Sequence, residues 1–358
     1  MISILDRYII KKFLGTYVFS IALIISIAVV FDINEQLDKF LKKDAPLPAI
    51  IFDYYVNFVP YFANLFSSLF VFISVIFFTS KLANNSEIIA MLSNGMSFKR
   101  LMKPYMISAA IISIVSFLMS GFVIPPANAK RIDFQNKYIK DKSVDWGSKI
   151  QIQVEPGVIA FMETFDNKEG SGRNFSLDKF DDKELVSRLT AKTIEYDSGF
   201  HWVIKDYSIR NFVGMRETII NGKHLDTTLQ VTPQDFLIAV NDFEKMTTPQ
   251  LYQHIKKQKD RGIGNVQSFE IEFHSRFASI ASAFILTIIG ASLSSRKIKG
   301  GMGLNIGIGL LLSVSYILFM TISSTFAVSG LMSPLVAAWF PNFVFAFVAA
   351  FVYRKAPN

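Results

Sequence analysis

Hydrophobic residues gather in five long stretches of this chain from which charged side chains are missing. The stretches without any Asp, Glu, Lys or Arg are residues 13–31, 54–80, 104–129, 277–295 and 300–353. A helix needs roughly 20 apolar residues to cross a bilayer core, so each of the first four stretches predicts one crossing. The fifth is long enough for two crossings, divided where turn-forming residues gather at Ser329-Gly330 and Ser333-Pro334. The pattern therefore predicts six membrane spans, at about 13–31, 54–80, 104–125, 273–295, 302–326 and 333–353.

The residues before the first span carry a helical pattern of their own. Ile4, Leu5, Tyr8, Ile9 and Phe13 recur at helical spacing against charged neighbours. This pattern is typical of a short amphipathic helix lying on the membrane surface. The first span is longer than the apolar core of a secretory signal, and no small-x-small cleavage site followed by a mature domain comes after it, so we expect an uncleaved anchor.

Between the third and fourth spans the hydrophobic period changes to two. Ile150, Ile152 and Val154 alternate with glutamines, and the later segments 185–196, 202–212 and 217–229 are rich in Thr, Val, Ile and aromatic residues. These features predict β-strands, separated by turns at 197–199 and at Asn221-Gly222. From Thr247 a helical pattern begins, with Thr248 as its expected N-cap and Pro249 in its first turn.

The expected fold class is therefore an α-helical polytopic membrane protein of three plus three spans with an inserted all-β domain. Residues 1–125 form the N-terminal membrane half and residues 266–358 the C-terminal membrane half. Residues 126–265 form the inserted domain, a β-sandwich or a half-open jelly roll with a following helix. Because 51% of the residues are hydrophobic and the mean hydropathy is +0.35, the composition also excludes an ordinary soluble domain.

The net charge of +8 indicates orientation and not nucleic-acid binding. Acidic and basic residues balance between Pro126 and Arg276, so the excess lies in the membrane halves. If the spans alternate, one side receives most of it: Arg7, Lys11, Lys12, Lys81, Lys99, Arg100, Lys103, Arg296, Lys297, Lys299, Arg354 and Lys355. By the positive-inside rule, both termini are expected in the cytoplasm and the all-β domain outside it.

No pattern of catalytic residues occurs in the sequence. It has no phosphate-binding glycine-rich loop, no paired histidine motif, no Gly-x-Ser-x-Gly elbow and no cysteine. We therefore expect no enzyme activity, metal or cofactor in this chain. The spans also carry no ionisable residue in their interiors, which argues against an ion-coupled carrier. Any transport would then have to be powered by a partner.

The loop between the second and third spans predicts a short helix at about 84–95. Asn84 and Glu87 resemble a capping box, and Asn94-Gly95 is a helix stop. Between them the sequence predicts an exposed apolar face of four residues, which are Ile88, Ile89, Met91 and Leu92. Two interpretations stay open at this point, namely a surface helix lying on lipid and a coupling helix that docks on a cytoplasmic motor subunit.

Two further groups of residues are candidates for function. Lys39, Lys42 and Lys43 follow the outer end of the first span. They either snorkel and pair with nearby acids or contact anionic lipid head groups. Gly303, Gly307 and Gly309 in the fifth span allow close helix approach, which suits internal packing, a subunit interface or a seam that opens to lipid.

These same segments resemble the LptF/LptG family, the permease subunits of the lipopolysaccharide export ABC transporter. The resemblance is carried by residues 5–9 (LDRYI), by the loop 87–97 leading to Pro104, by 124–128 (IPPAN) and by 270–276 (EIEFHSR). The span-one pattern and the length resemble LptG more than LptF. An ABC-type subunit acting on lipoproteins or the cell wall, and a non-transporting membrane scaffold, are the alternative functions.

The resemblance implies a bacterial inner-membrane protein that pairs with a second LptF/LptG-family permease and with an LptB-like cytoplasmic ATPase homodimer. Lipopolysaccharide would pass to periplasmic jelly-roll proteins resembling LptC and LptA. It also implies that Glu87, with Ile88, Met91, Leu92 and Gly95, forms the ATPase-coupling helix, and that Lys39, Lys42 and Lys43 contact the lipid. Residues 13–31 and 303–326 would line a lateral gate.

Overall fold

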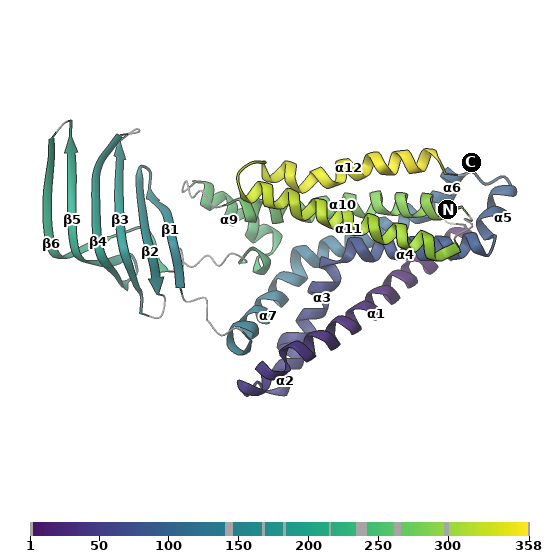
Figure 1. Cartoon of the computed structure of the whole chain (residues 1–358), viewed down its shortest axis with the longest axis horizontal. Helices are drawn as coiled ribbons and strands as arrows, with labels where there is room; N and C mark the ends of the chain where they lie inside the picture. The colour runs from purple at the N-terminus through teal and green to yellow at the C-terminus, as the bar shows by residue number, and fades with distance from the viewer. Residues whose placement is uncertain are drawn as a thin grey trace. The chain divides into compact units, whose positions relative to one another are not determined.

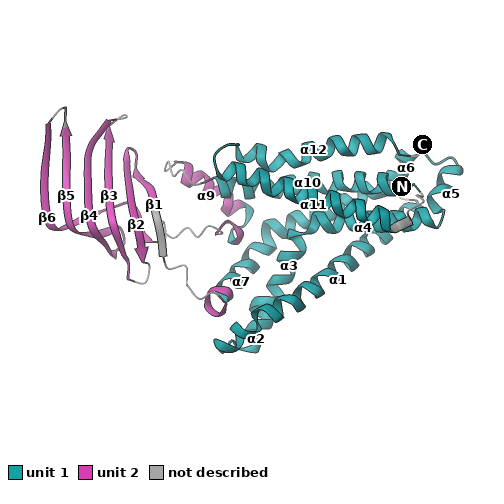
Figure 2. Ribbon diagram, viewed as in Figure 1, with its two compact units in different colours: residues 1–134, 245–248, 267–358 teal, residues 135–244, 249–266 magenta. Residues whose placement is uncertain are grey.

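The computed structural model describes residues 3–139, 146–166, 169–181, 184–214, 216–233, 242–260, 266–296 and 301–356. The chain divides into two compact units (Figures 1 and 2). Unit 1 comprises residues 1–134, 245–248 and 267–358 and is helical, whereas unit 2 comprises residues 135–244 and 249–266 and holds a β-sheet.

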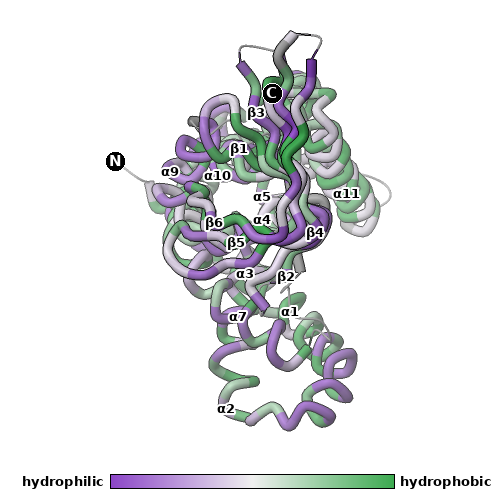
Figure 3. Tube along the Cα trace, turned by 90° about the vertical axis from the view of Figure 1, so that its left-hand side faces the viewer, coloured by the Kyte–Doolittle hydropathy of each residue, from purple (hydrophilic) through white to green (hydrophobic). Residues whose placement is uncertain are grey.

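Unit 1 is built from long apolar helices. In the described residues six helices are long and apolar enough to cross a membrane, so the six spans are confirmed. The colouring of Figure 3 shows hydrophobic residues recurring along α11. The helices that begin in this unit are α1 (Ile4–Lys42), α2 (Leu47–Ala49), α3 (Val56–Leu65), α4 (Ser67–Asn84), α5 (Glu87–Ser93), α6 (Phe98–Leu118), α7 (Ile124–Tyr138), α10 (Gln267–Ser294), α11 (Gly301–Val328) and α12 (Pro334–Arg354), with π-helical turns η1 (Ile50–Tyr55) and η2 (Met119–Val123).

The structure differs from the expected spans at two places. The amphipathic segment before the first span is not a separate surface helix, because α1 runs without a break from Ile4 to Lys42. The second expected span, 54–80, is divided at Phe66, whose ψ of 15° interrupts the helix between α3 and α4. The sequence pattern records only where side chains are charged and where they are apolar. It therefore cannot locate a backbone break inside an apolar stretch. The expected break at 329–334 is confirmed, with Gly330 at a φ of +80° and α12 beginning at Pro334.

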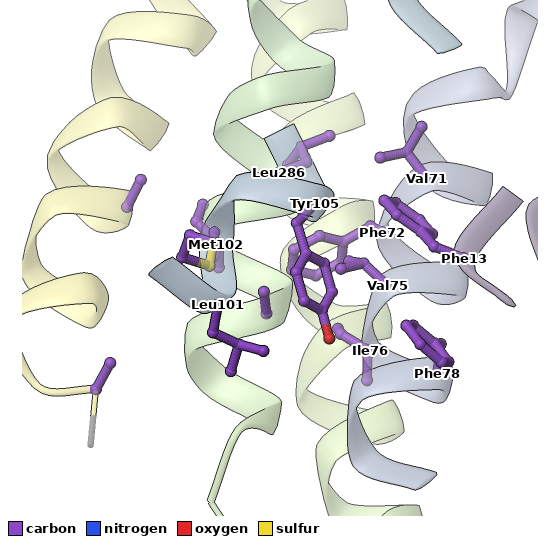
Figure 4. Close-up of a cluster of buried hydrophobic side chains, with 14 of the residues drawn as sticks. Phe13, Val71, Phe72, Val75, Ile76, Phe78, Leu101, Met102, Tyr105 and Leu286 are labelled. Carbon is purple, nitrogen blue, oxygen red and sulfur yellow. The ribbon is translucent and has the colours of Figure 1, made fainter. Parts of the chain in front are cut away.

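The centre of unit 1 is α10, which packs against α4, α6 and α12. Small residues let these helices approach closely, since a Cβ atom at Gly290 of α10 would overlap the Cγ1 of Val75 in α4. The apolar core extends to α1 and α6, where Phe13 and Tyr105 are buried with their ring centroids 5.9 Å apart (Figure 4).

A buried arginine of α10 holds residues 246–248 against this helix. Arg276 is only 4% exposed, and its guanidinium donates to Oε1 of Glu272 at 2.8 Å. It also donates to Oγ1 of Thr248 and to the backbone carbonyl of Met246, both at 3.0 Å. Thr248, expected as the N-cap of a helix, is instead the first residue of α9 (Thr248–Asp260), and its hydroxyl accepts from this arginine.

Replacing Arg276 with methionine is expected to lower the free energy of unfolding by about 2–3 kcal/mol, because buried hydrogen bonds to a charged group are lost. The thermal midpoint of the detergent-purified chain measures this effect. Arg296→Met is the matched control, since Arg296 is exposed and we expect less than about 0.5 kcal/mol there. Equal midpoints for the two variants would show that the Arg276 contacts add no stability.

Unit 2 contains one six-stranded antiparallel sheet in which every described strand pairs with its neighbour in sequence. The all-β domain is thereby confirmed, and its strand order is simpler than that of a two-sheet sandwich. Apolar side chains gather on one face, as where Met162 lies opposite Phe175, and Trp202 donates its indole N–H to the carbonyl of Val231 at 3.0 Å. The strands are β1 (Trp146–Glu155), β2 (Val158–Asp166), β3 (Ser171–Asp181), β4 (Glu184–Ser198), β5 (His201–Val213) and β6 (Arg216–Thr228).

The turn expected at Asn221-Gly222 is wrong. Both residues lie inside β6, where Gly222 pairs with Tyr207 of β5. A Cβ atom at Gly222 would lie 2.5 Å from the Tyr207 ring, so glycine is present here to make room for that ring. The turn expected at 197–199 begins only at Gly199, which has a φ of +57°, because residues 197 and 198 still belong to β4.

Candidate functional site

The short helix α5 follows directly on α4 at the end of unit 1 that carries the termini (Figure 1). It spans Glu87–Ser93 and is shorter than expected, because Asn84 is the last residue of α4 and cannot cap the next helix. Ser86 precedes it in the left-handed conformation, with a φ of +61° and no side-chain cap. The expected stop is confirmed, since the helix ends before Asn94 and Gly95 has a φ of +85°.

The predicted exposed face of α5 is wrong in one respect. Ile88 is fully buried and packs in the same core as Ile9, Leu82 and Phe98. Ile89 is 49% exposed, whereas Met91 and Leu92 are half-buried against the core. In a helix of two turns only one side can face outward, and attachment to the core at Ile88 decides which side that is.

Glu87 is held in place at the start of α5 by two donors. The hydroxyl of Tyr8 in α1 donates to its Oε2, and the side-chain amide of Asn85 donates to its Oε1, both at 3.2 Å. The carboxylate is half-buried and therefore oriented but still accessible. The Tyr8 contact joins α5 to the first helix of the chain.

A second link between the same elements was not foreseen from the sequence. Asp6 is only 1% exposed, and both of its carboxylate oxygens accept from the Arg100 guanidinium in the first turn of α6, at 2.6 and 2.8 Å. Its Oδ2 also accepts from the backbone N–H of Ser3. The hydrogen bonds from Arg100 hold the pKa of Asp6 well below its ordinary value, so the carboxylate is charged at neutral pH. Nothing in the sequence connects two residues 94 positions apart.

The three candidate lysines lie in the last turns of α1, at the opposite end of this helix. Lys42 is exposed, Lys43 is half-buried, and Lys39 donates to Oε1 of Gln36 at 3.1 Å. Nearby, Phe40 packs its ring against Tyr54, with the centroids 5.9 Å apart. The helix end that carries the lysines is therefore anchored by aromatic packing.

One acid near these lysines, Asp32, has partners of its own. It accepts from the hydroxyls of Tyr54 and Tyr55 at 3.2 and 3.0 Å. This carboxylate is thereby directed toward the tyrosines of η1 and not toward the lysines two to three turns later.

The three glycines of α11 have different surroundings. Gly303 and Gly307 face open space, with no atom near the position of a Cβ. Gly309 lies against α4, where a Cβ atom would overlap the Cδ1 of Ile76. Four residues before Gly309, the buried side chain of Asn305 donates to the hydroxyl of Ser80 at 3.1 Å. One stripe of α11 therefore packs internally, and the stripe with Gly303 and Gly307 does not.

The family model for the lipopolysaccharide export system permease LptF/LptG matches residues 7–355 of the chain. The chain belongs to the LptF/LptG family. A search of the curated proteins finds no match. LptF and LptG share this one family model, so the match does not assign the chain to either of them.

Membership of the LptF/LptG family establishes the general role of the chain. It is a permease component of the lipopolysaccharide export ABC transporter, a membrane protein of the inner membrane that works with partner proteins. The family supplies the permease and not the catalytic subunit.

Proposed function

We propose that unit 1 forms one wall of the path by which lipopolysaccharide leaves the inner membrane, with α1 and α11 facing the lipid. The observation that carries this proposal is that α1 and α11 bury the smallest share of their residues among the six spans. Phe31 of α1 and Leu311 of α11 are each 71% exposed. Both helices pack on α4, so one helix of the bundle supports two apolar surfaces that the described residues leave exposed.

The orientation follows from the charges. Arg7, Lys11 and Lys12 precede the first span, and Arg354 and Lys355 follow the last one. Positive-inside charge bias therefore supports cytoplasmic termini, a cytoplasmic α5 and a periplasmic sheet. In this orientation the lysines at the end of α1 lie at the periplasmic surface, where the phosphorylated head group of lipopolysaccharide is expected.

In the same proposal α5 receives the ATPase. Its outward side offers Ile89 as an exposed apolar contact and Glu87 as an oriented carboxylate, with Met91 and Leu92 half-exposed beside them. Ile88 has a different role from the one expected, because it holds the helix to the core. Gly95 ends α5 in a conformation that other residues rarely adopt, and so sets where α6 begins. The second permease and the jelly-roll partners complete the complex.

Photo-cross-linking in cells tests the lipid path. A photoreactive residue at Phe31 or Leu311 is expected to capture lipopolysaccharide, whereas the same residue at Phe345, which is 3% exposed, is the buried control. Lys42→Glu should lower the cross-linking yield about tenfold, because the exposed ammonium is replaced by a charge that repels phosphate, a change of more than 1 kcal/mol.

Lys39→Glu should have a smaller effect, since this ammonium already donates to Gln36. Capture of protein alone at both exposed positions would favour a scaffold or a lipoprotein-directed subunit. An unchanged cross-linking yield for Lys42→Glu would show that Lys42 does not contribute to lipopolysaccharide binding.

A further inference from the structure

We infer that Asp6, Tyr8 and Arg100 are positioning residues that connect α5 to α1, so that a force on α5 moves the first span. The inference rests on the proposed function, in which α5 receives the ATPase and α1 faces the lipid. It adds the physical connection between these two places.

The first part of this connection is the ion pair between Asp6, which is buried, and Arg100, whose side chain is 38% exposed. Its geometry is bidentate, with both carboxylate oxygens accepting from separate guanidinium nitrogens. Such pairs fix direction as well as distance, because two parallel hydrogen bonds resist rotation. Arg100 also donates to the hydroxyl of Ser3, the N-cap of α1, at 3.2 Å. The first turn of α1 is thus tied to the first turn of α6.

The second part is the contact of α5 with α1. The Tyr8 hydroxyl donates to Glu87, and the next residue of each helix, Ile9 and Ile88, is buried in the same apolar core. Only the loop of residues 94–97 separates α5 from α6 in sequence. The starts of α1, α5 and α6 are therefore held together by two polar contacts, one ion pair and shared apolar packing.

Because the arginine of this pair is partly exposed to solvent, we expect the pair to add little to stability. Asp6 and Arg100 do provide a directional link between two helices that are far apart in sequence. Between residues 14 and 35, α1 buries one apolar side chain, Ile25. Hydrogen bonds between Tyr17 and Ser67 and between Ser74 and Ser20 also hold this middle part to α4. Because the far end of α1 is anchored at Phe40, displacement of its start would bend or rotate the middle of the helix, where few buried side chains resist the movement.

The test uses the complete transporter in vesicles and measures ATP hydrolysis and lipopolysaccharide release together. Tyr8→Phe removes only the hydroxyl from a half-exposed ring and should lower the lipid released per ATP about three- to tenfold, with the ATPase still recovered in the complex. Tyr353→Phe is the matched control at the same end of unit 1, because its ring packs against Phe98 of α6. Release per ATP equal to that of the unchanged protein would overturn the role of Tyr8.

The ion pair is tested by rebuilding the link with different chemistry. The chain has no cysteine, so Asp6→Cys with Arg100→Cys places a single pair of thiols in it. We expect release per ATP to fall at least tenfold in this double variant and to recover when a bifunctional maleimide of about the length of an arginine side chain bridges the thiols. A fully assembled, bridged complex that still hydrolyses ATP without releasing lipid would show that the pair does not transmit movement.

These outcomes are separable from those of the proposed function. If the ATPase is recovered equally with the unchanged chain and with Glu87→Arg, α5 is not its docking site and the proposed function fails. If Glu87→Arg loses the ATPase while Tyr8→Phe and the double cysteine variant release lipid normally, the proposed function stands and the inferred connection fails.

Discussion

Glu87→Arg is expected to remove the ATPase from the purified complex and to abolish lipopolysaccharide export. The carboxylate at the start of α5 is oriented by Tyr8 and Asn85 and remains partly accessible, which suits pairing with a basic group on a partner. Removing one member of a charge pair at an interface costs about 2–5 kcal/mol, and reversing its sign adds repulsion. Recovery of the ATPase on a tagged chain should therefore fall by more than about thirtyfold.

Two further variants test whether docking requires the charge of Glu87 or the apolar surface beside it. Glu87→Gln keeps an oxygen that accepts from Tyr8 but loses the charge, so it should lie between the unchanged chain and Glu87→Arg. Ile89→Asp places a charge on the exposed apolar position next to it and should also weaken recovery. Glu184→Arg, an equally large charge reversal at an exposed position in β4, should leave recovery unchanged. Full recovery with Glu87→Arg would exclude α5 as the docking element.

The contrast between Ile88 and Ile89 shows what a sequence pattern leaves open in so short a helix. Two adjacent isoleucines in a seven-residue helix fit either side equally well, because two turns give too few positions for a period to be measured. The buried side is decided by Ile9, Leu82 and Phe98, which come from three other helices. The spans were predictable for the opposite reason, since each repeats the same apolar choice over about 20 residues.

Long-range polar contacts were equally out of reach of the sequence. Asp6 and Arg100 each resemble an ordinary charged residue at a membrane edge, and only the fold brings them within 2.6 Å. Asn221-Gly222 has the form of a hairpin turn, yet its glycine serves the ring of Tyr207 on the neighbouring strand. In both cases the deciding partner is distant in sequence. Local sequence preference therefore gave no prediction for the Asp6–Arg100 pair and a wrong prediction for Asn221-Gly222.

The glycines of α11 allow a second decisive experiment, because two of them differ from the third in their surroundings. Gly309→Val should destabilise the chain by about 1–3 kcal/mol, the usual cost of overpacking a core. Its Cβ would overlap the terminal methyl of Ile76, which can rotate away, but the two added methyl groups would also reach toward Phe72. Gly309→Ala should therefore cost less than Gly309→Val. Thermal midpoints of the detergent-purified variants give both values.

Gly303→Val and Gly307→Val are the matched controls in the same helix. Since a Cβ at either position meets no atom of the described residues, both should unfold at the temperature of the unchanged protein. A loss of export or of the partner permease in these stable variants would place the open stripe of α11 in a subunit contact or a seam toward lipid. Normal export would show that Gly303 and Gly307 are not needed for function, so that Gly309, through the packing of α11 on α4, would be the functionally required glycine. A drop in midpoint as large as that of Gly309→Val would contradict the open surroundings of Gly303 and Gly307.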